Sequence, residues 1–486
     1  MVSIYFTDFF EVLPEELEDY GALNISLIND LPLFIDPFLL FNSENPVYKR
    51  LHDEIISYVR FLRDKSASGQ IDAGLLRAWY FFGEVKQNWL GYSKEGNSGS
   101  GLGPKFARDL NSNLNAIFTD FGNEKVARAS HLEKLCLVSE GVGKDNVSDF
   151  TTNLIKEFLL DYTQEFAVKN IAPNHRKTFS VSRARFNYKT EVWESRKYDL
   201  PTFGDDYVIL TPKEILTKDD TWISRTDLFD NYEDIASAIP NEQLRAQINN
   251  YFSSQLPREP KKEDYYRATQ RTLLKYPSIL EHYIRQKEDN GDEAVSISSE
   301  RVAESEVIFI AQARSFASEL ASGTRFYAQS GKTYGEARER VMFLKDVIEN
   351  KDGYRLFYLK NQPLKREQDL QLLFRLTWFG TTSDVNREVN NGRGPVDFSI
   401  SKGKRDKSLV EFKLAGNSQL KRNLEKQVAI YEKASDATRS IKVILYFSEQ
   451  ELQKTLSILK ELKISEGEDV ILIDARKDNK PSASKA

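Results

Sequence analysis

The sequence has 486 residues, of which 40% are hydrophobic and 29% are charged, and its formal net charge is -5 at pH 7. This length predicts about three domains, and the composition is typical of a folded protein rather than a disordered one. One cysteine and four widely spaced histidines exclude a disulfide framework and a cysteine-rich zinc module. The N-terminus lacks the features of a signal peptide, and no apolar run reaches membrane-spanning length, so we expect a cytoplasmic protein without membrane contact.

Residues 1–175 are predicted to form a mainly helical domain. The segments PVYKRLHDEIISYVRFLRD and TTNLIKEFLLDYTQEFAV repeat apolar residues at helical spacing. A glycine-rich turn at 141–143 enters a helix that carries Asp149 and Asn153 on one face. These residues indicate either a second polar site or, as we favour, a helix whose N-cap is Ser148 or Asp149.

Residues 176–355 are predicted to form a mixed region, with strands first and helices after them. Alternating and β-branched residues at 178–212 indicate the strands. Charged segments that contain Pro or Gly, at 254–264 and 285–296, are expected to be loops. With the region before it, this segment predicts a mixed α+β protein whose N-terminal part is largely helical.

The clearest pattern lies in residues 356–476, which predict in order a helix, three strands, a helix, a strand, a helix and a last strand. Asp397 lies on the second strand, and Glu411 and Lys413 lie on the third. Since side chains alternate along a strand, Glu411 and Lys413 share a face, and a hairpin places Asp397 beside Glu411. Residues 477–486 are expected to be a disordered tail.

The side chains of Asp397, Glu411 and Lys413 suit metal-assisted hydrolysis of a phosphodiester. Mg²⁺ typically takes one or two carboxylates and completes its shell with waters and phosphate oxygens. A lysine beside these acids could orient an attacking water and stabilise negative charge in the transition state. The alternative interpretation is an exposed ion pair of little energetic value, which the apolar residues around each charge argue against. We therefore expect a Mg²⁺ site, in which Mn²⁺ could substitute.

This pattern resembles that of the PD-(D/E)xK nuclease superfamily. The sequence PVD at 395–397 is followed by EFK at 411–413, and the element order is similar to the αβββαβ core of that superfamily. The resemblance covers residues 360–476 and implies a fold like that of restriction endonucleases. The N-terminal three quarters of the chain resemble no family that we can name.

The resemblance also implies a role for each acid and for the lysine. Asp397 and Glu411 would ligate the metal ion, and Lys413 would act on the water. Glu367, on the helix before the first strand, would add a further acid to the catalytic and metal-binding set. Gln371 lies one turn further along the same helix.

Further residues are expected to contact the nucleic acid. Gln427 and Tyr431 are one helical turn apart and resemble the Q-xxx-Y helix of the RecB-like branch, which implies contact with the substrate. Basic residues near the strands and at the start of that helix either follow a nucleic-acid backbone or form an ordinary surface. They are Arg387, Arg393, Lys402, Lys404, Arg405, Lys407, Lys421 and Arg422.

Charge supports a polyanionic partner. From residue 355 onward basic residues outnumber acidic ones, although the whole chain is acidic. A basic C-terminal part indicates nucleic acid as the partner, with a solvated charged surface as the alternative.

The resemblance implies a Mg²⁺-dependent endonuclease acting on DNA, with RNA as the alternative substrate. Such a module joined to a long, unrecognised region is similar to the architecture of bacterial restriction and antiphage defence systems. The N-terminal region would then sense a trigger or a partner protein. Cutting both strands needs two sites or successive nicks, so we expect a homo-oligomer. The other interpretation is an inactive module with a nuclease-like fold that binds nucleic acid or a protein.

Overall fold

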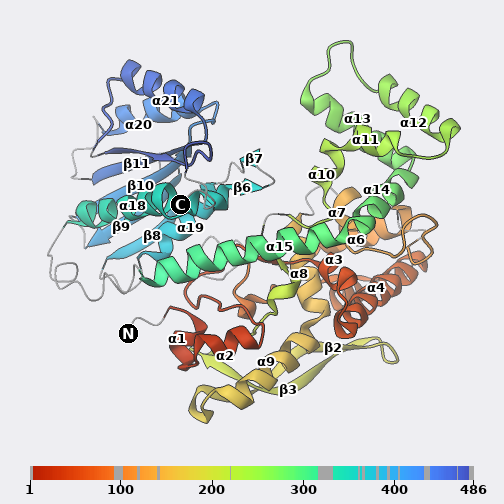
Figure 1. Ribbon diagram of the computed structural model, residues 1–486. Helices are drawn as coiled ribbons and strands as arrows, with labels where there is room; N and C mark the ends of the chain where they lie inside the picture. Colours follow the sequence, from red (N-terminus) through yellow and green to blue (C-terminus); the bar gives the residue numbers. More distant parts are fainter. Residues whose placement is uncertain are drawn as a thin grey trace.

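The structure is a computed structural model, and it describes most of the chain. The described residues are 4–69, 71–91, 102–117, 121–138, 143–218, 220–315, 332–359, 362–363, 367–378, 383–390, 395–402, 406–431, 438–467 and 469–480. Within these ranges, the side chains of residues 113, 115–117, 138, 262, 359, 384, 386–390, 395–396, 426–431 and 438 are not described. The protein is mixed α+β, as the sequence predicts, with helices dominating the N-terminal part and a five-stranded sheet near the C-terminus (Figure 1).

The N-terminal body is built mainly from helices. In the long helix α4 (Pro46–Ala67), the Asn45 side chain caps the first turn by accepting the backbone N–H of Val47. Apolar residues at helical spacing, such as Leu51 and Ile55, turn one face of α4 into the core. The other helices here are α1 (Phe6–Phe10), α2 (Pro14–Asp19), α3 (Pro37–Asn42), α5 (Ala73–Tyr80), α6 (Pro104–Ile117), α7 (Lys134–Val138), α8 (Lys144–Leu154) and α9 (Lys156–Asn170).

A long β-hairpin covers one side of the N-terminal body. Strands β2 (Arg176–Asn187) and β3 (Val192–Phe203) pair antiparallel and pack on α9. Val181 and Leu200 of this hairpin belong to the same buried core as α4. The hairpin therefore packs together with the helices of the N-terminal body. The remaining strands here are β1 (Phe34–Ile35), which pairs with β5 (Leu216–Thr217), and β4 (Asp206–Tyr207), which pairs with β3.

A helical lobe with a core of its own follows. Its buried residues include Ile223, Leu228, Ile248 and Leu280, and Phe38 joins them from α3. Figure 1 shows this lobe at the upper right, apart from the sheet. Its helices are α10 (Arg225–Asp230), α11 (Tyr232–Ser237), α12 (Glu242–Ser254), α13 (Lys262–Lys275) and α14 (Ser278–Asp289).

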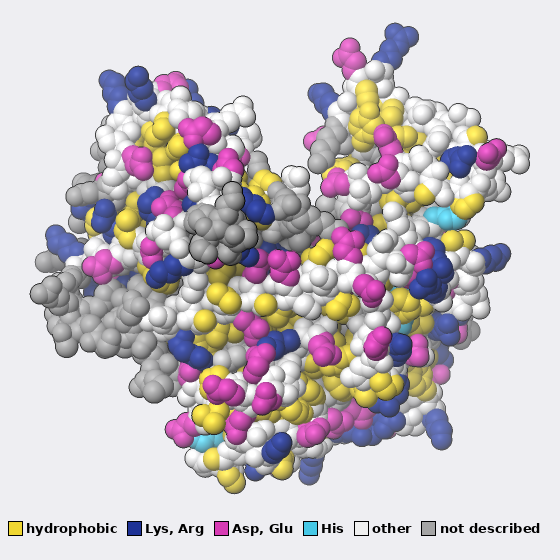
Figure 2. Space-filling view, viewed as in Figure 1, with side chains coloured by type: hydrophobic (Ala, Val, Ile, Leu, Met, Phe, Trp, Pro, Cys, Tyr) yellow, Lys and Arg dark blue, Asp and Glu magenta, His cyan; other side chains and the backbone are white. Residues whose placement is uncertain are grey.

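Helix α15 (Gly291–Glu306) returns the chain toward the sheet and continues as a π-helical segment, Val307–Gln312. The expectation of a loop at 285–296 is wrong, because α14 runs to Asp289 and α15 begins directly after Asn290. Gly291 permits this junction, since a Cβ there would lie 2.0 Å from the side-chain oxygen of Asn42. The space-filling view shows an open notch between the helical lobe and the sheet (Figure 2).

The C-terminal unit is organised around the five-stranded sheet. The strand order is β12-β11-β10-β9-β8, in which β8, β9 and β10 are antiparallel neighbours and β10, β11 and β12 run parallel. Along the chain, the order of helices and strands from α19 onward is the one that the sequence predicts. The strands are β8 (Asp384–Asn390), β9 (Pro395–Lys402), β10 (Asp406–Leu414), β11 (Thr438–Tyr446) and β12 (Val470–Asp474), preceded by the short pair β6 (Tyr358–Leu359) and β7 (Gln362–Pro363).

Helices cover both faces of this sheet. Helices α18 and α19 pack on the face that carries Phe398 and Phe412, and α20 and α21 pack on the face that carries Ile444. Helix α18 thus contacts the sheet although it precedes residue 356 in the chain. The bounds of these helices are α18 (Thr333–Asn350), α19 (Glu367–Leu376), α20 (Leu420–Tyr431) and α21 (Glu449–Glu461).

The expected disordered tail begins with residues that contact the sheet. Asn479 donates a hydrogen bond to the Asp474 carboxylate, at the end of β12, at 2.8 Å. Residues 481–486 lie outside the described residues. Of the helices that the structure describes, none is long and apolar enough to cross a membrane.

Candidate functional site

The candidate residues of the C-terminal unit lie where β9 and β10 pair. Val410 is the partner of Phe398 in the antiparallel register, so the next residues along, Glu411 and Asp397, face each other across the two strands. Phe398 and Val410 are fully buried on the side of α18 and α19. Because side chains alternate along a strand, Asp397, Glu411 and Lys413 lie on the opposite face.

Lys413 links the two strands. Its Nζ lies 3.6 Å from Asp397 Oδ2 and donates to the Phe412 carbonyl oxygen at 2.8 Å. The same Asp397 oxygen accepts the Phe412 backbone N–H at 2.6 Å. The Asp397 carboxylate is thus held by both a backbone donor and an ammonium. The side chains of Asp397 and Lys413 are 17% and 20% exposed, so water and a substrate can reach them.

Glu411 is the most buried acid of this group, with 5% of its surface exposed. Burial raises the pKa of Glu411 to about 6. The charge of Lys413 lowers this pKa, that of Asp397 raises it, and that of Lys442 lowers it. Glu411 Oε2 has no hydrogen-bond partner within the described part of the chain. A bound cation would offset the desolvation that penalises this charge, so the unpartnered oxygen favours a role as a cation ligand.

Glu367 reaches the same place from a different element. It lies in the first turn of α19, and its Oε1 accepts the Leu414 backbone N–H at the end of β10, at 3.2 Å. Burial raises the pKa of Glu367, Lys413 lowers it and Asp397 raises it. The structure therefore brings the three predicted acids and the predicted lysine near enough for their charges to influence one another.

A metal ion would find two carboxylates here rather than a complete ligand cage. No group of three or more His, Cys, Asp or Glu side chains that could hold a metal ion occurs among the residues with described positions. Asp397 and Glu411 supply hard carboxylate oxygens on adjacent strands, and the buried Glu411 Oε2 has no hydrogen-bond partner among the described residues. This donor set fits Mg²⁺, whose protein sites often consist of one or two carboxylates, waters and substrate phosphate.

Two family models match the sequence. One is described as Domain of unknown function (DUF8370) and matches residues 12–224, and the other as Domain of unknown function (DUF8371) and matches residues 333–449. We call these stretches the DUF8370 region and the DUF8371 region. The second begins at the first residue of α18 and contains Asp397, Glu411 and Lys413. No curated protein and no solved structure matches the chain.

Lys442 is a residue of the DUF8371 region that the sequence analysis missed. It lies on β11 as the register partner of Glu411, and only 7% of it is exposed. Burial lowers its pKa, and the neighbouring Glu411 and Asp469 raise it. The signal was a lysine inside the apolar run IKVILYFS, since a charge within a buried strand needs a partner.

The predicted nucleic-acid contacts are described only in part. Gln427 and Tyr431 are on α20, but their side chains lie outside the described residues, as does that of Arg387. Lys402 forms an ion pair with Glu336 of α18 at 3.1 Å, so it is engaged within the protein. The candidates that fall wholly outside the described residues are Arg393, Lys404 and Arg405.

In the DUF8370 region, the expected N-cap at Ser148 or Asp149 is wrong. Helix α8 begins at Lys144 with Gly143 as its N-cap, so both residues lie inside the helix. The Ser148 hydroxyl instead accepts the backbone N–H of Ile35 on β1 at 2.9 Å. This hydrogen bond gives Ser148 a structural role that only the packing of α8 on β1 could reveal.

Asp149 belongs to a group of acids that we call the N-terminal acidic cluster: Asp30, Glu84, Asp145 and Asp149. Burial and repulsion from Glu84 and Asp145 raise the pKa of Asp149 to about 7. Burial and repulsion from Glu84 and Asp149 raise the pKa of Asp30 to about 8. The principal influences on these two acids all favour the protonated form.

Proposed function

We propose that the DUF8371 region is a metal-dependent nuclease that hydrolyses phosphodiester bonds in DNA, as its resemblance to the PD-(D/E)xK superfamily implies. The observation that supports this most directly is the placement of Asp397, Glu411 and Lys413 side by side on neighbouring strands, with Glu367 at their edge. Carboxylates beside an ammonium suit hydrolysis, because the acids can hold a cation and the ammonium can meet charge that develops on the phosphate.

Asp397 and Glu411 are the residues that would hold Mg²⁺, or Mn²⁺ in its place. When bound, the ion would lower the pKa of a water and polarise a phosphate oxygen. Lys413 would orient the attacking water and stabilise negative charge in the transition state. The contacts of its Nζ with Asp397 and with the Phe412 carbonyl restrict it before substrate arrives, which lowers the entropic cost of its action.

The other residues of the proposed site would act around this centre. Glu367 would contribute a further acid from the end of α19, next to the last residue of β10. Gln427 and Tyr431 would position the nucleic-acid strand from α20, as the Q-xxx-Y resemblance implies. The excess of basic over acidic residues from residue 355 onward favours a polyanionic substrate.

We propose that the DUF8370 region and the helical lobe regulate the nuclease in response to a trigger or a partner protein. The support is architectural, since the helical lobe has a core of its own, the DUF8370 region shares a continuous core with the sheet, and neither part resembles a nuclease component. A homo-oligomer would supply two sites for cutting both strands. A role in antiphage defence or restriction is consistent with this arrangement.

A second candidate function is binding of nucleic acid without cleavage. It is favoured by one observation, the absence of a three-ligand metal group from the described residues. In that case Lys413 and Lys442 would serve to neutralise buried acids, and nucleic acid would be held by contacts that depend on salt and not on a divalent ion.

The experiment is to incubate the full chain with supercoiled plasmid, linear DNA and RNA in Mg²⁺, Mn²⁺ or EDTA. We expect cleavage of DNA with either metal ion and none with EDTA. Asp397→Ala and Lys413→Ala should each lower the cleavage rate by roughly 10²–10⁴-fold, because each removes a ligand or charge needed in the transition state. Cleavage of RNA alone would replace DNA as the substrate.

The matched control is Lys454→Ala, which removes an exposed ammonium from α21. This variant should cleave at the wild-type rate. DNA binding that weakens with salt, ignores EDTA and leads to no cleavage by the wild-type protein would support the second candidate instead.

A further inference from the structure

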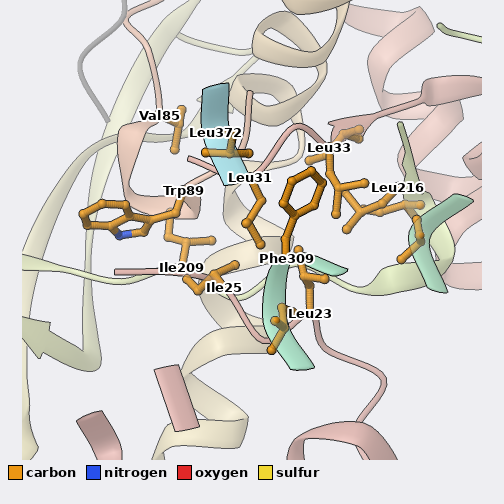
Figure 3. Packing of buried hydrophobic residues seen from close by; sticks show 14 of the residues in the cluster. Leu23, Ile25, Leu31, Leu33, Val85, Trp89, Ile209, Leu216, Phe309 and Leu372 are labelled. Carbon is orange, nitrogen blue, oxygen red and sulfur yellow. The ribbon is translucent and has the colours of Figure 1, made fainter. Parts of the chain in front are cut away.

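Helix α19, which carries Glu367, is buried between the sheet and the N-terminal body. On one side the Phe374 ring packs against Phe398 at 5.0 Å and Phe412 at 5.3 Å between ring centroids. On the other side Leu372 belongs to the cluster that includes Leu31 and Leu33 of the DUF8370 region, as Figure 3 shows. A helix enclosed on both sides is positioned by both neighbours.

A charged pair joins α19 to the DUF8370 region inside this interface. Lys218 Nζ lies 2.9 Å from Asp369 Oδ2, and neither side chain has any exposed surface. Lys218 directly follows β5, whose pairing with β1 fixes the backbone there. The ammonium also donates to the Leu356 carbonyl oxygen at 3.3 Å. One lysine of the N-terminal body therefore contacts the chain before α19 and a side chain on α19 itself.

Arg301 of α15 strengthens the same junction. Its guanidinium donates to the Leu356 carbonyl oxygen at 3.0 Å and to the Arg355 carbonyl oxygen at 2.9 Å. Only 4% of Arg301 is exposed. The backbone of Arg355 and Leu356 is thus held by Lys218, directly after β5, and by Arg301 of α15, and both cations belong to the part of the molecule outside the C-terminal sheet.

The position of Asp369 connects this junction to the proposed site. Asp369 lies two residues after Glu367 on α19, and an α-helix rises only about 1.5 Å per residue, so a shift of one moves the other. Glu367 in turn accepts the Leu414 N–H at the end of β10, where the site begins. The chain of contacts from Lys218 to the site contains one helix and two hydrogen bonds.

The pair is better suited to fixing position than to adding stability. Two buried charges lose most of their attraction to desolvation, and an apolar pair of similar volume often stabilises a core as well or better. A charged hydrogen bond has a defined direction and length, whereas an apolar contact tolerates sliding. The two functions can therefore be separated by substitution.

We propose that Lys218 is a positioning residue for the site: by holding Asp369 it fixes α19, and with it Glu367, relative to β10. The DUF8370 region would act on the nuclease through this contact, so a trigger that moves β5 would change the geometry of the acids. The inference about metal binding rests on the proposed function, but the inference about the position of α19 does not.

Three variants of the full chain test this. Lys218→Met removes the ammonium from Asp369. The double variant Lys218→Met/Asp369→Leu replaces both charges with apolar side chains. Leu159→Ala opens a cavity in α9, in another part of the same core, and serves as a control for lost stability. The readouts are the melting temperature, amide hydrogen exchange in α19 and the affinity for Mn²⁺ measured by titration calorimetry without substrate.

We expect Lys218→Met to weaken Mn²⁺ binding by about 10–100-fold, the range typical of residues that orient metal ligands, and to speed exchange in α19. The double variant should regain the melting temperature but not the affinity. Leu159→Ala should melt earlier and bind Mn²⁺ normally.

The proposal is overturned if affinity follows the melting temperature in all three variants, because Lys218 is then merely structural. It is also overturned if Lys218→Met leaves exchange in α19 unchanged. A wild-type protein that binds no Mn²⁺ contradicts the proposed function instead, and the exchange measurement then decides the positioning role alone.

Discussion

Two groups of acids in this protein each contain a buried member whose pKa is raised, but the surroundings of the two groups differ. In the DUF8371 region burial raises the pKa of Glu411 to about 6, while the ammonium groups of Lys413 and Lys442 oppose that rise. In the N-terminal acidic cluster burial and repulsion between acids raise the pKa of Asp30 to about 8. A carboxyl group beside ammoniums is ionised at neutral pH, whereas one beside other acids is mostly protonated there.

The comparison teaches that burial alone does not identify a functional acid. In the sheet, strand alternation places Lys413 on the same face as Glu411, and β11 adds Lys442 beside it. The negative charge of Glu411 is therefore retained at neutral pH, where it can take part in catalysis. In the N-terminal acidic cluster the same burial favours the neutral form, and its consequence is a stability that depends on pH.

The largest effect on the cleavage rate is expected for Glu411→Gln. The substitution keeps the shape of the side chain but removes the negative charge that would bind the metal ion, so we expect the cleavage rate to fall by roughly 10²–10⁴-fold. Glu425→Gln, on the exposed side of α20, is the matched control. Undiminished cleavage by Glu411→Gln would place the metal ligand elsewhere.

A smaller effect is expected on the N-terminal acidic cluster. Since the folded-state pKa of Asp30, about 8, lies above its ordinary value, folding is favoured while this carboxyl is protonated, and that contribution is lost as pH rises through 8. Between pH 6 and 9 the wild-type protein should lose about 1–3 kcal/mol of unfolding free energy from this group.

Urea unfolding of the wild type and of Asp30→Asn across this pH range measures the loss. The pH dependence should be reduced in Asp30→Asn and retained in Asp53→Asn, whose carboxylate is 83% exposed. Equal slopes in the wild type and Asp30→Asn would show that Asp30 is ionised in the folded protein.

The smallest effect is expected for Lys442→Met. Lys442 lowers the pKa of Glu411, so its removal should move the acid side of the pH–cleavage profile to higher pH by less than about one pH unit. The profile of Lys454→Ala should match the wild type. A shift toward lower pH would mean that Lys442 does not act on Glu411 through its charge.

Much of the C-terminal unit could be predicted from the sequence, because its strands and helices show in the pattern of neighbouring residues. Alternation along β10 was sufficient to place Glu411 and Lys413 on one face, and the predicted antiparallel pairing of β9 and β10 was sufficient to bring Asp397 opposite Glu411. Lys442 was missed because parallel pairing of β10 with β11 depends on the crossover through α20, and local pattern does not specify that register.

The errors elsewhere come from contacts between distant segments. A charged stretch with a glycine reads as a loop, but Gly291 begins α15 because its small size lets Asn42 approach. Ser148 reads as a helix cap, but its hydroxyl is used by Ile35. In both cases a partner more than a hundred residues away decides the role, and sequence periodicity carries no information about it.

The sequence by itself determined the order of helices and strands from α19 onward and the faces on which the strand side chains lie, because these follow from the fixed periods of helix and strand. Tertiary structure alone decided that α19 is enclosed between the sheet and the N-terminal body and that Lys218 meets Asp369 there. Burial of an ion pair depends on how whole layers stack, and the free energy that selects one stacking is spread over many apolar contacts rather than encoded in any short segment.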